Sequence, residues 1–403
     1  MAATTGRHQG RYHADVIVVG GGMVGAATAV ALAQEDLEVA LIEREPPAPL
    51  GGDDPFDLRV SALAPASIAL LDRLGAWPSI RAERAALYRR MRVFDAAGPG
   101  DLTFDAAEVG RPYLGYIVEN RRVQLALWEQ LREFDNVECF TGSQPQRLEV
   151  GERDVTLTLA DGRELRADLV IGADGQRSWV RETAGIGAAS RDYPVAAQIL
   201  SVETAYPQQD ITWQRFTPDG PQAFLPLAGH RGSLVWYDAP ERIRARHALS
   251  PEALGEAAMV AFPDELGEIT RVAGQAWFPI RRMHAHRYWA DRVLLVGDAA
   301  HSIHPLAGQG ANLGFADVEA LADVVREMGD RGLGDARLAR AYERRRRADN
   351  QLVQSLMDGF DWGYRRVDPL TVAARTAATQ LVAGVPPLRR WMTRMAGGSR
   401  LGS

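Results

Sequence analysis

Lysine is absent from this chain of 403 residues, and cysteine occurs once, at Cys139. A single cysteine excludes an intrachain disulfide, a CxxC redox pair and a cysteine-rich zinc site, and it fits a reducing compartment. All 46 basic residues are therefore arginines, and 52 acidic residues outnumber them to give a net charge of −6. No overall positive field favours nucleic acid as a partner, although local basic patches remain open.

Long apolar runs are also missing. No uninterrupted apolar stretch reaches the about 18 residues of a membrane-spanning helix, and residues 1–14 lack the apolar core of a secretory signal. We therefore expect no transmembrane helix. With 46% apolar and 24% charged residues, the composition is that of a globular protein long enough for two packed domains.

A glycine-rich turn between an apolar strand and a helix stands near the start of the chain. The stretch ADVIVVGGGMVGAATAVALAQEDLEVALIERE predicts a buried strand at 15–19, a helix of small residues and a second strand at 38–43. This order is a βαβ unit, the context in which a GxGxxG spacing carries meaning.

The GxGxxG spacing is formed by Gly20, Gly22 and Gly25. The first glycine permits the turn, the second lets the backbone approach a pyrophosphate, and the third lets helix and strand pack closely. Glu43 ends the second strand, where a carboxylate accepts both hydroxyls of an adenosine ribose, so FAD or NAD fits better than NADP. Arg44 beside it weakens that preference, and a glycine-rich turn without any ligand is the alternative.

Two acidic turns follow later strands. In DLVIGADGQRSWVR, Asp174 stands just past a strand at 168–172, and in RVLLVGDAAHSIHPLAGQGAN, Asp298 ends a strand and precedes a glycine-rich helix start. Each motif alone is weak. Together with the GxGxxG turn, in this order, they resemble the three-motif signature of the flavoprotein aromatic hydroxylases, the single-component FAD monooxygenases.

This resemblance implies roles for the last motif. Asp298 accepts hydrogen bonds from the ribityl chain. The backbone of Gly308, Gly310, Ala311 and Asn312 donates to the flavin pyrimidine from a helix N-terminus, whose dipole stabilises negative charge there.

Other positions also match flavin-site residues of that group. Arg59 and Gln124 correspond to contacts with the flavin or its pyrophosphate, and Asp174 to a region used by both FAD and the nicotinamide donor. A surface salt bridge or a polar helix face remains the alternative for the first two, and a turn that caps the following helix is the alternative for Asp174. Arg121 and Arg122 stand close to Gln124, so the register of its contact stays open.

The histidines of the last motif invite two other interpretations. His301 and His304 stand three apart, as metal ligands on a helix can, but no cysteine or obvious third ligand accompanies them, and Pro305 interrupts the helix. A serine hydrolase would need a nucleophile elbow that the sequence lacks. We therefore predict no metal. By the resemblance, Pro305 lies near the oxygen-reactive carbon of the flavin, and the role of the two histidines stays open.

Longer stretches narrow the resemblance. TWQRFTPDGPQAFLPL, SLVWYDAPERIRA, GDAAHSIHPLAGQGANLGFADVEAL and GVPPLRRWMTRMAGG are similar to the hydroxylases of ubiquinone biosynthesis, and the similarity runs from about 14 to 397. Within this branch, the chain most resembles enzymes that hydroxylate 2-polyprenyl-3-methyl-6-methoxy-1,4-benzoquinol. His304 departs from the asparagine common in the branch.

The resemblance implies an FAD-dependent monooxygenase that hydroxylates the aromatic ring of a polyprenylated benzoquinol or phenol through a flavin C4a-hydroperoxide. The cofactor performs the oxygen transfer, so no single catalytic side chain is required. Because there is no second GxGxxG, the reductant is either NAD(P)H that docks transiently or a protein electron donor. The alternatives are a flavin oxidoreductase of the same fold acting on another aromatic or prenyl substrate, and a non-enzymatic prenyl-binding protein.

The expected fold is α/β, with a Rossmann-like FAD-binding domain of the glutathione-reductase type, an inserted antiparallel β-sheet substrate domain and C-terminal helices. The pattern of strands and helices sets the predicted boundaries. They are 1–13 for a disordered N-terminus, 14–75, 115–185 and 286–345 for the FAD-binding domain, 76–114 and 186–285 for the substrate domain, and 346–403 for a C-terminal helical region.

Aromatic residues on the inserted strands could contact a substrate or form plain core. They are Trp213, Phe224, Trp236, Tyr237 and Phe278.

A polyprenyl tail would bring the enzyme to the bilayer. Leu388, Trp391, Met392 and Met395 form an apolar stripe with arginines around it, which favours either an interfacial helix or packing on the protein body. The resemblance implies a cytoplasmic protein with peripheral contact to the inner membrane face. It also implies a prenylated quinol and O₂ as substrates, and a place in a multi-enzyme ubiquinone-biosynthesis complex.

Overall fold

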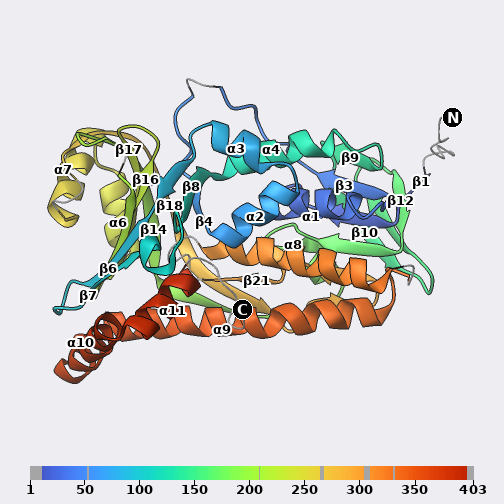
Figure 1. The fold of residues 1–403 in the computed structure, drawn as a ribbon. Coiled ribbons are helices and arrows are strands. Elements are labelled where there is room, and N and C mark those ends of the chain that lie inside the picture. The colour runs from blue at the N-terminus through green and yellow to red at the C-terminus, as the bar shows by residue number, and fades with distance from the viewer. Residues whose placement is uncertain are drawn as a thin grey trace.

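The computed structural model describes residues 11–51, 54–207, 209–263, 267–303, 309–329 and 332–396. Two regions lie side by side in Figure 1, and one long helix runs beneath both. The region on the right is built on a mostly parallel sheet, and the region on the left on a larger, mostly antiparallel one.

A six-stranded sheet in the order β19-β20-β13-β2-β3-β9 forms the first region. Five strands are parallel, and β19 (Trp289–Ala290) runs antiparallel at the edge. The parallel strands are β2 (Val16–Val19), β3 (Val39–Glu43), β9 (Val137–Thr141), β13 (Leu169–Gly172) and β20 (Val293–Leu295). α1 (Met23–Ala33) follows β2, so the predicted βαβ unit is present. β2 is buried along its whole length, as in a sheet covered on both faces.

Helices and a small meander share one apolar core with this sheet. These helices include α1, α4 (Asn120–Leu131) and α8 (Gln309–Met328). The meander is a four-stranded sheet of β1 (Arg11–His13), β12 (Glu164–Ala167), β11 (Val155–Leu159) and β10 (Pro145–Val150). Residues 1–10 of the predicted disordered N-terminus lie outside the described residues. The next three, however, form β1, because they pair with β12.

An eight-stranded sheet in the order β21-β18-β14-β17-β16-β15-β6-β7 forms the second region. Its strands are β6 (Arg90–Asp95), β7 (Asp101–Asp105), β14 (Ala188–Thr204), β15 (Ile211–Thr217), β16 (Gly220–Leu227), β17 (Arg231–Asp238), β18 (Ile269–Ala285) and β21 (His301–Ser302). β14 and β18 are each 17 residues long and reach from the first region into the second (Figure 1). Every neighbouring pair is antiparallel except β15 with β6.

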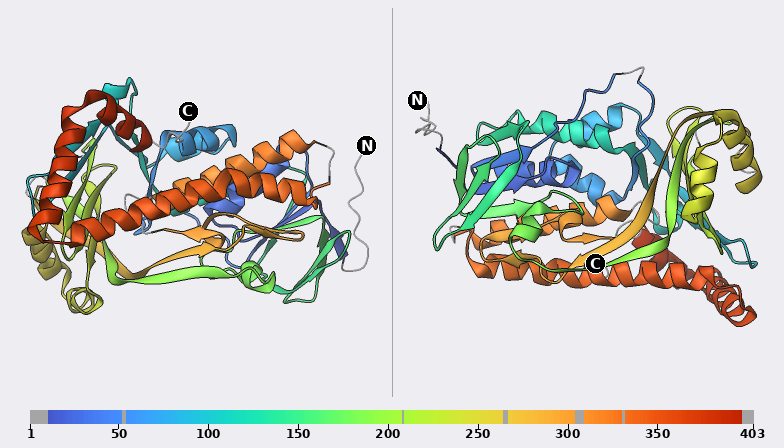
Figure 2. Two further views of the ribbon diagram at one scale, coloured as in Figure 1. Left: turned by 90° about the horizontal axis from the view of Figure 1, so that it is seen from below. Right: turned by 180° about the vertical axis from the view of Figure 1, so that it is seen from behind.

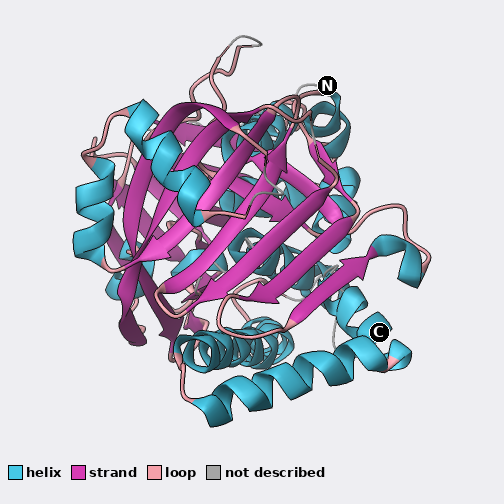
Figure 3. Cartoon of the chain, turned by 90° about the vertical axis from the view of Figure 1, so that its left-hand side faces the viewer, coloured by secondary structure: helices cyan, strands magenta, loops and turns pink. Residues whose placement is uncertain are grey.

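The prediction of successive strands over 186–285 missed two helices. α6 (Pro240–His247) and α7 (Pro251–Ala261) cover the face of the large sheet that points away from the first region (Figures 1 and 3). Both begin with proline, and the Ser250 side chain accepts the N–H of Ala253 at 3.2 Å to cap α7. A capping serine followed by proline is a helix-start signal that the sequence contained.

Residues 76–114 contribute to both regions. α3 (Trp77–Ala82) packs beside α2 (Pro65–Arg73) and α4, and β5 (Ala86–Tyr88) joins β4 (Val60–Leu63) and β8 (Gly115–Glu119) in a small sheet. β6 and β7 instead join the large sheet, and η1 (Ala106–Val109) follows them. The domain boundaries given above stay a prediction.

The described chain ends in α9 (Ala336–Arg365), α10 (Pro369–Gly384) and α11 (Pro386–Ala396). α9 runs along both regions, α10 projects from its end, and α11 turns back toward the sheet (Figures 1 and 2). Among the helices of the described residues, none combines the length and apolar character needed to cross a membrane.

Candidate functional site

The predicted motifs meet at one edge of the parallel sheet. The glycine turn follows β2, Asp174 follows β13 and Asp298 follows β20, and these three strands are adjacent and parallel. Glu43 ends β3, on the other side of β2. The carboxyl ends of parallel strands share one edge, which is where open α/β sheets bind ligands.

The glycine turn is crowded at two positions and open at one. Gly20 has a φ of +102°, and a Cβ there would stand 2.6 Å from the Ala173 carbonyl oxygen. A Cβ on Gly25 would stand 1.8 Å from the Gly20 carbonyl oxygen, so no side chain fits there. A Cβ on Gly22 would have no neighbour within 4 Å, and no side chain in the described residues caps α1 at this end. The turn therefore offers open backbone and first-turn N–H donors at Gly22.

Glu43 turns its carboxylate toward this loop. Its Oε2 accepts the N–H of Gly21 at 2.5 Å, and its Oε1 accepts the N–H of Glu45 at 2.9 Å. Arg44 lies next to it but is exposed, with its Nε 3.4 Å from a Glu45 carboxylate oxygen. The acid thus lies beside the glycine turn, while the adjacent cation pairs with a surface acid.

Gln124 of α4 also reaches the glycine turn. Its Nε2 donates to the Gly21 carbonyl oxygen at 2.8 Å. Arg121 instead binds the Asp57 carboxylate with two N–H groups, at 2.8 and 3.0 Å, and Arg122 is buried against α3. Of these three neighbours, Gln124 is the one whose side chain bonds to the turn, and its contact with the cofactor stays a prediction.

Asp174 has a capping contact and an unpartnered oxygen. Its Oδ2 accepts the N–H of Val180 at 3.0 Å, so it caps α5 (Trp179–Thr183). Its Oδ1 is buried, with no hydrogen-bond partner in the described part of the chain. Desolvation by burial raises the pKa of this carboxyl group. Both readings of Asp174 therefore remain compatible with its geometry.

The two acidic turns are tied to each other. Arg181 Nη1 donates to the carbonyl oxygens of Gln176 at 3.1 Å and Ala299 at 3.0 Å. Gln176 Nε2 donates to Ser302 Oγ at 2.8 Å. These bonds join the turn after β13 to the turn after β20.

Asp298 stands in the turn that follows β20. Gly297 starts η3 (Gly297–Ala299) with a φ of +59°, a left-handed conformation that suits glycine, and turns the chain away from β20. The Asp298 side chain is exposed although its two chain neighbours are buried. Desolvation still raises its pKa, while the charges of His301 and Arg59 lower it. The Asp298 carboxyl group is thus accessible at the sheet edge. Arg59 is an exposed residue just before β4, and its charge favours the ionised form of Asp298.

The N-terminus of α8 faces the same edge. α8 begins one residue before Gly310, so the N–H groups of Gly310, Ala311 and Asn312 lie in its first turn, where helices have no internal acceptor. The Asn312 side chain donates to the Ala62 carbonyl at 2.8 Å and accepts the N–H of Ala64 at 3.0 Å. It therefore holds the start of α8 against β4.

Three residues singled out in the sequence, His304, Pro305 and Gly308, lie outside the described residues. Their places beside the flavin stay predictions.

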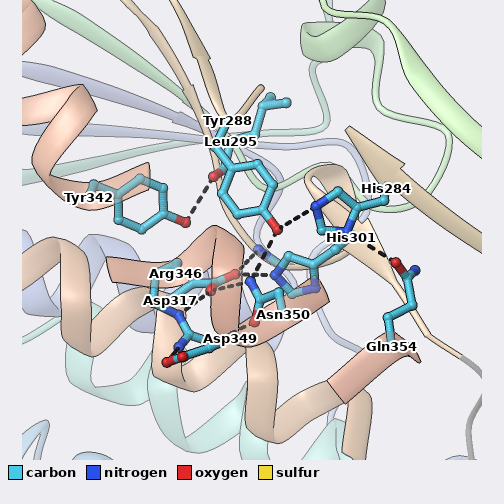
Figure 4. Close-up of polar contacts among 11 residues, drawn as sticks. His284, Tyr288, Leu295, His301, Asp317, Tyr342, Arg346, Asp349, Asn350 and Gln354 are labelled. Atoms are coloured by element: carbon cyan, nitrogen blue, oxygen red, sulfur yellow. Dashed lines mark hydrogen bonds and ion pairs between the residues drawn. The ribbon is translucent and has the colours of Figure 1, made fainter. Parts of the chain in front are cut away.

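A buried polar cluster beneath the Asp298 turn was not predicted (Figure 4). Asp317 of α8 accepts the N–H of Gly297 at 3.0 Å, pairs with His301 Nε2 at 2.6 Å and accepts from Arg346 Nε of α9 at 2.7 Å. Burial would raise the pKa of Asp317, but the charges and hydrogen bonds of His301 and Arg346 hold it well below its usual range. The cluster fastens the Asp298 turn to α8 and α9.

The cluster extends toward the large sheet. Arg346 Nη2 donates to Asn350 at 2.7 Å, Asn350 donates to the Tyr288 hydroxyl at 3.3 Å, and that hydroxyl lies 3.3 Å from His284 Nε2. Burial lowers the pKa of His284 to about 4, so this ring is neutral near pH 7. The signal that could have revealed the cluster is Asp317, an acid on the apolar side of a predicted helix, because a buried acid needs partners.

His301 is thus a structural partner of Asp317. Within the described residues, no group of three or more His, Cys, Asp or Glu side chains is arranged to hold a metal ion.

The aromatic residues of the inserted strands divide between the two faces of the large sheet. Trp213, Phe224 and Trp236 pack in the apolar cluster under α7. Tyr237 and Phe278 belong to a cluster on the opposite face, since successive strand residues alternate. That face is the one turned toward the first region (Figure 1).

Comparisons with known proteins agree with this arrangement. The sequence profile of the family described as "FAD binding domain" matches residues 13–356. The 3-demethoxyubiquinol 3-hydroxylase of Escherichia coli (strain K12) is 44% identical over 354 residues, covering 87% of this chain and 90% of that protein. The ubiquinone hydroxylase UbiL of Rhodospirillum rubrum is 37% identical over 391 residues, covering 96% and 90%. Among solved structures, the p-nitrophenol 4-monooxygenase PnpA from Pseudomonas putida DLL-E4 has a TM-score of 0.78 at 22% identity, covering 96% of this chain and 99% of that chain.

Proposed function

Because the chain belongs to the FAD-binding domain family and is an FAD-dependent monooxygenase, we propose that it hydroxylates the aromatic ring of a polyprenylated benzoquinol or phenol in ubiquinone biosynthesis. The observation that carries the proposal is the meeting of the glycine turn, Asp174 and Asp298 at one sheet edge. The substrate class is supported by relatives that are named as ubiquinol or ubiquinone hydroxylases and cover most of the chain.

The chain's residues fit FAD along this edge. The open backbone at Gly22 and the uncapped start of α1 suit the pyrophosphate, and Glu43 beside them suits the adenosine ribose. The accessible Asp298 carboxyl group suits the ribityl chain, and the charge of Arg59 favours its ionised form.

The remaining predicted residues suit other parts of the cofactor site. The first-turn N–H groups of Gly310, Ala311 and Asn312 suit the flavin pyrimidine. Gln124 acts by holding the glycine turn, and the buried, unpartnered oxygen of Asp174 suits a donor from the cofactor. Gly20 and Gly25 act by allowing the close approach of α1 and β13.

When bound and reduced, FAD activates O₂ for transfer to an electron-rich ring carbon. The chain's own task is to orient the ring, exclude water and hydrogen-bond the phenolic oxygen. The sheet face with Tyr237 and Phe278 provides apolar surface toward the FAD-binding region. Burial raises the pKa of Tyr237, so this side chain stays a neutral phenol and does not act as a base.

The proposal extends to the protein's surroundings. The first region binds FAD and the large sheet covers the substrate, with NAD(P)H or a protein electron donor as the reductant. A polyprenyl tail calls for peripheral contact with the inner face of the cytoplasmic membrane, and enzymes acting on one membrane-held intermediate can assemble into a complex.

Complementation tests this function. The chain is expressed in bacterial strains that each lack one ring hydroxylase of ubiquinone biosynthesis, and the quinones that accumulate are identified by mass. We expect restored ubiquinone in the strain without the 3-demethoxyubiquinol 3-hydroxylase. A folded Asp298→Ala variant without bound flavin is the control and should rescue no strain. Failure of the unchanged, flavin-loaded chain to rescue any strain would contradict the proposal.

A further inference from the structure

Exposed apolar side chains are concentrated on the last three helices. Of the fourteen large hydrophobic side chains that are exposed in the described residues, nine lie between Leu352 and Trp391. We call these nine the C-terminal apolar face, and they are Leu352, Leu356, Phe360, Trp362, Val367, Leu370, Leu381, Val385 and Trp391. Soluble proteins rarely gather so many exposed apolar groups without an interaction to cover them.

The outer side of α10 is the most uniform part of this face. Its exposed positions Leu370, Ala373, Ala374, Ala377, Ala378 and Leu381 recur at helical spacing, and Leu370 is 80% exposed. Arg375 is the single charged residue of α10, and its Nε points inward to Asp95 at 2.6 Å. Their side chains are only 10% and 4% exposed, so this pair anchors α10 to β6. α10 is therefore held in place while its apolar side stays outward.

Positive charge surrounds the same helices. Residues 350–396 contain six arginines and three aspartates, a net charge of +3 in a chain whose total is −6. Arg390 and Arg394 are exposed, and no carboxylate in the described part of the chain pairs with either. Apolar residues with tryptophan and bordering arginines are the composition of surfaces that lie in the headgroup region of an anionic bilayer.

The inner side of these helices packs against residues that adjoin the candidate site. Val382, Ala383 and Met392 pack on an apolar cluster that also includes Ala62 and Leu225. Of the stripe predicted on α11, Met392 thus packs on the body and Leu388 is half-buried, whereas Trp391 is exposed. The Ala62 carbonyl accepts the hydrogen bond from Asn312, so this cluster connects the C-terminal apolar face with the segment assigned to the flavin.

We propose that the C-terminal apolar face rests on an anionic lipid bilayer, with α10 lying in the plane of the headgroups. α10 has 16 residues, fewer than the about 20 that a spanning helix needs, which fits an in-plane position. A second copy of this chain suits the face less well. It would bring the positively charged borders of the two copies together and bury Arg390 and Arg394 without acidic partners. This inference rests on the proposed function only for the purpose of the surface, which is to meet a substrate whose tail lies in the membrane.

Vesicle flotation of the full-length, flavin-loaded protein tests this surface. The probes are phosphatidylcholine vesicles with and without phosphatidylglycerol. Leu370→Glu with Leu381→Glu should lower the partition coefficient about tenfold or more, since charge replaces buried apolar area. Val260→Glu is the matched control, because Val260 is 89% exposed on α7, outside this face, and should leave partition unchanged. Arg390→Gln with Arg394→Gln should remove most of the preference for phosphatidylglycerol.

Three outcomes would overturn the proposal. The first is vesicle binding by the unchanged protein that the Leu370→Glu/Leu381→Glu variant retains. The second is a loss of vesicle binding in the Val260→Glu control that is as large as the loss in the leucine variant. The third is dissociation of an oligomer by the leucine variant, seen by size-exclusion chromatography, with partition unaltered, because that result assigns the face to a second copy. Hydroxylation of a short-tailed, water-soluble quinol should be the same in all variants. Vesicle binding without such activity in the unchanged protein would reject the function and leave the docking surface standing.

Discussion

Replacing Arg346 with methionine should destabilise the protein strongly at neutral pH. The Arg346 and Asp317 side chains are 4% and 0% exposed, and the Arg346 Nε lies 2.7 Å from the Asp317 carboxylate. Removing the arginine leaves a buried carboxylate without its guanidinium partner, and breaking such a pair costs about 3–5 kcal/mol. A cooperative unit of 403 residues unfolds with an entropy of about 850 cal/mol/K, so this loss corresponds to a fall in Tm of about 4–6 °C.

The loss of stability in the Arg346→Met variant should depend on pH. In the unchanged protein, the pKa of Asp317 is held below its usual value, so the stability from this group is present above the unfolded pKa of about 4 and is lost as pH falls below it. In the variant, burial is opposed by one cation fewer, and the folded pKa of Asp317 should rise. The deficit in Tm should therefore be largest near pH 7 and shrink as the pH falls toward about 5, because a protonated Asp317 needs no counter-charge.

Differential scanning calorimetry of the two proteins across that pH range provides the measurement. Arg345→Met is the matched control, since Arg345 is the neighbouring residue of α9 but pairs with Glu327 at the surface, an interaction of about 1 kcal/mol or less. Adding Asp317→Asn to Arg346→Met should restore part of the lost stability, because it removes the unpaired charge. Equal Tm values for Arg346→Met and Arg345→Met, or a deficit that does not depend on pH, would refute the reasoning.

Three further predictions concern the cofactor site and α10. Gly22→Ala should leave the apoprotein's Tm unchanged but weaken FAD binding about tenfold by fluorescence titration, whereas Gly25→Ala should cost about 3 kcal/mol or more, because its Cβ would stand 1.8 Å from a carbonyl oxygen. Equal effects of the two would show that the open position has no ligand role. Asp298→Ala should release FAD, seen as loss of the yellow colour on gel filtration, with the circular dichroism of the apoprotein preserved, and retained flavin with normal turnover would argue against its role. Arg375→Met should speed proteolytic cleavage between α9 and α10, because it leaves buried Asp95 unpaired, and an unchanged cleavage rate would count against the anchor.

Local patterns predicted the fold class, whereas the choice of FAD and the reaction type were implied by the resemblance that the three motifs carry. The βαβ unit could be predicted because a buried strand, a glycine turn and a helix of small residues are each encoded by neighbouring residues. α6 and α7 were missed because their short sequences lie among strands, and the helix-start signal of Ser250 before Pro251 was not used.

Side-chain partners were harder to predict than elements. The contact of Gln124 with Gly21, rather than a contact from Arg121 or Arg122, depends on how α4 lies against the glycine turn, and those residues are about 100 positions apart. The meaning of His301 depends in the same way on α8 and α9, which bring Asp317 and Arg346 to it.

The sequence by itself determined that a glycine turn and two acidic turns each follow a strand, since strand and turn formation depend on residues close in the chain. The tertiary structure alone decided that the three strands are neighbours, that Gly22 is the open glycine, and that α10 keeps its apolar side outward. The physical reason is that burial and charge pairing depend on which distant segments pack together. A buried carboxyl group such as that of Asp317 has a low pKa only where partners from other parts of the chain, here His301 and Arg346, surround it.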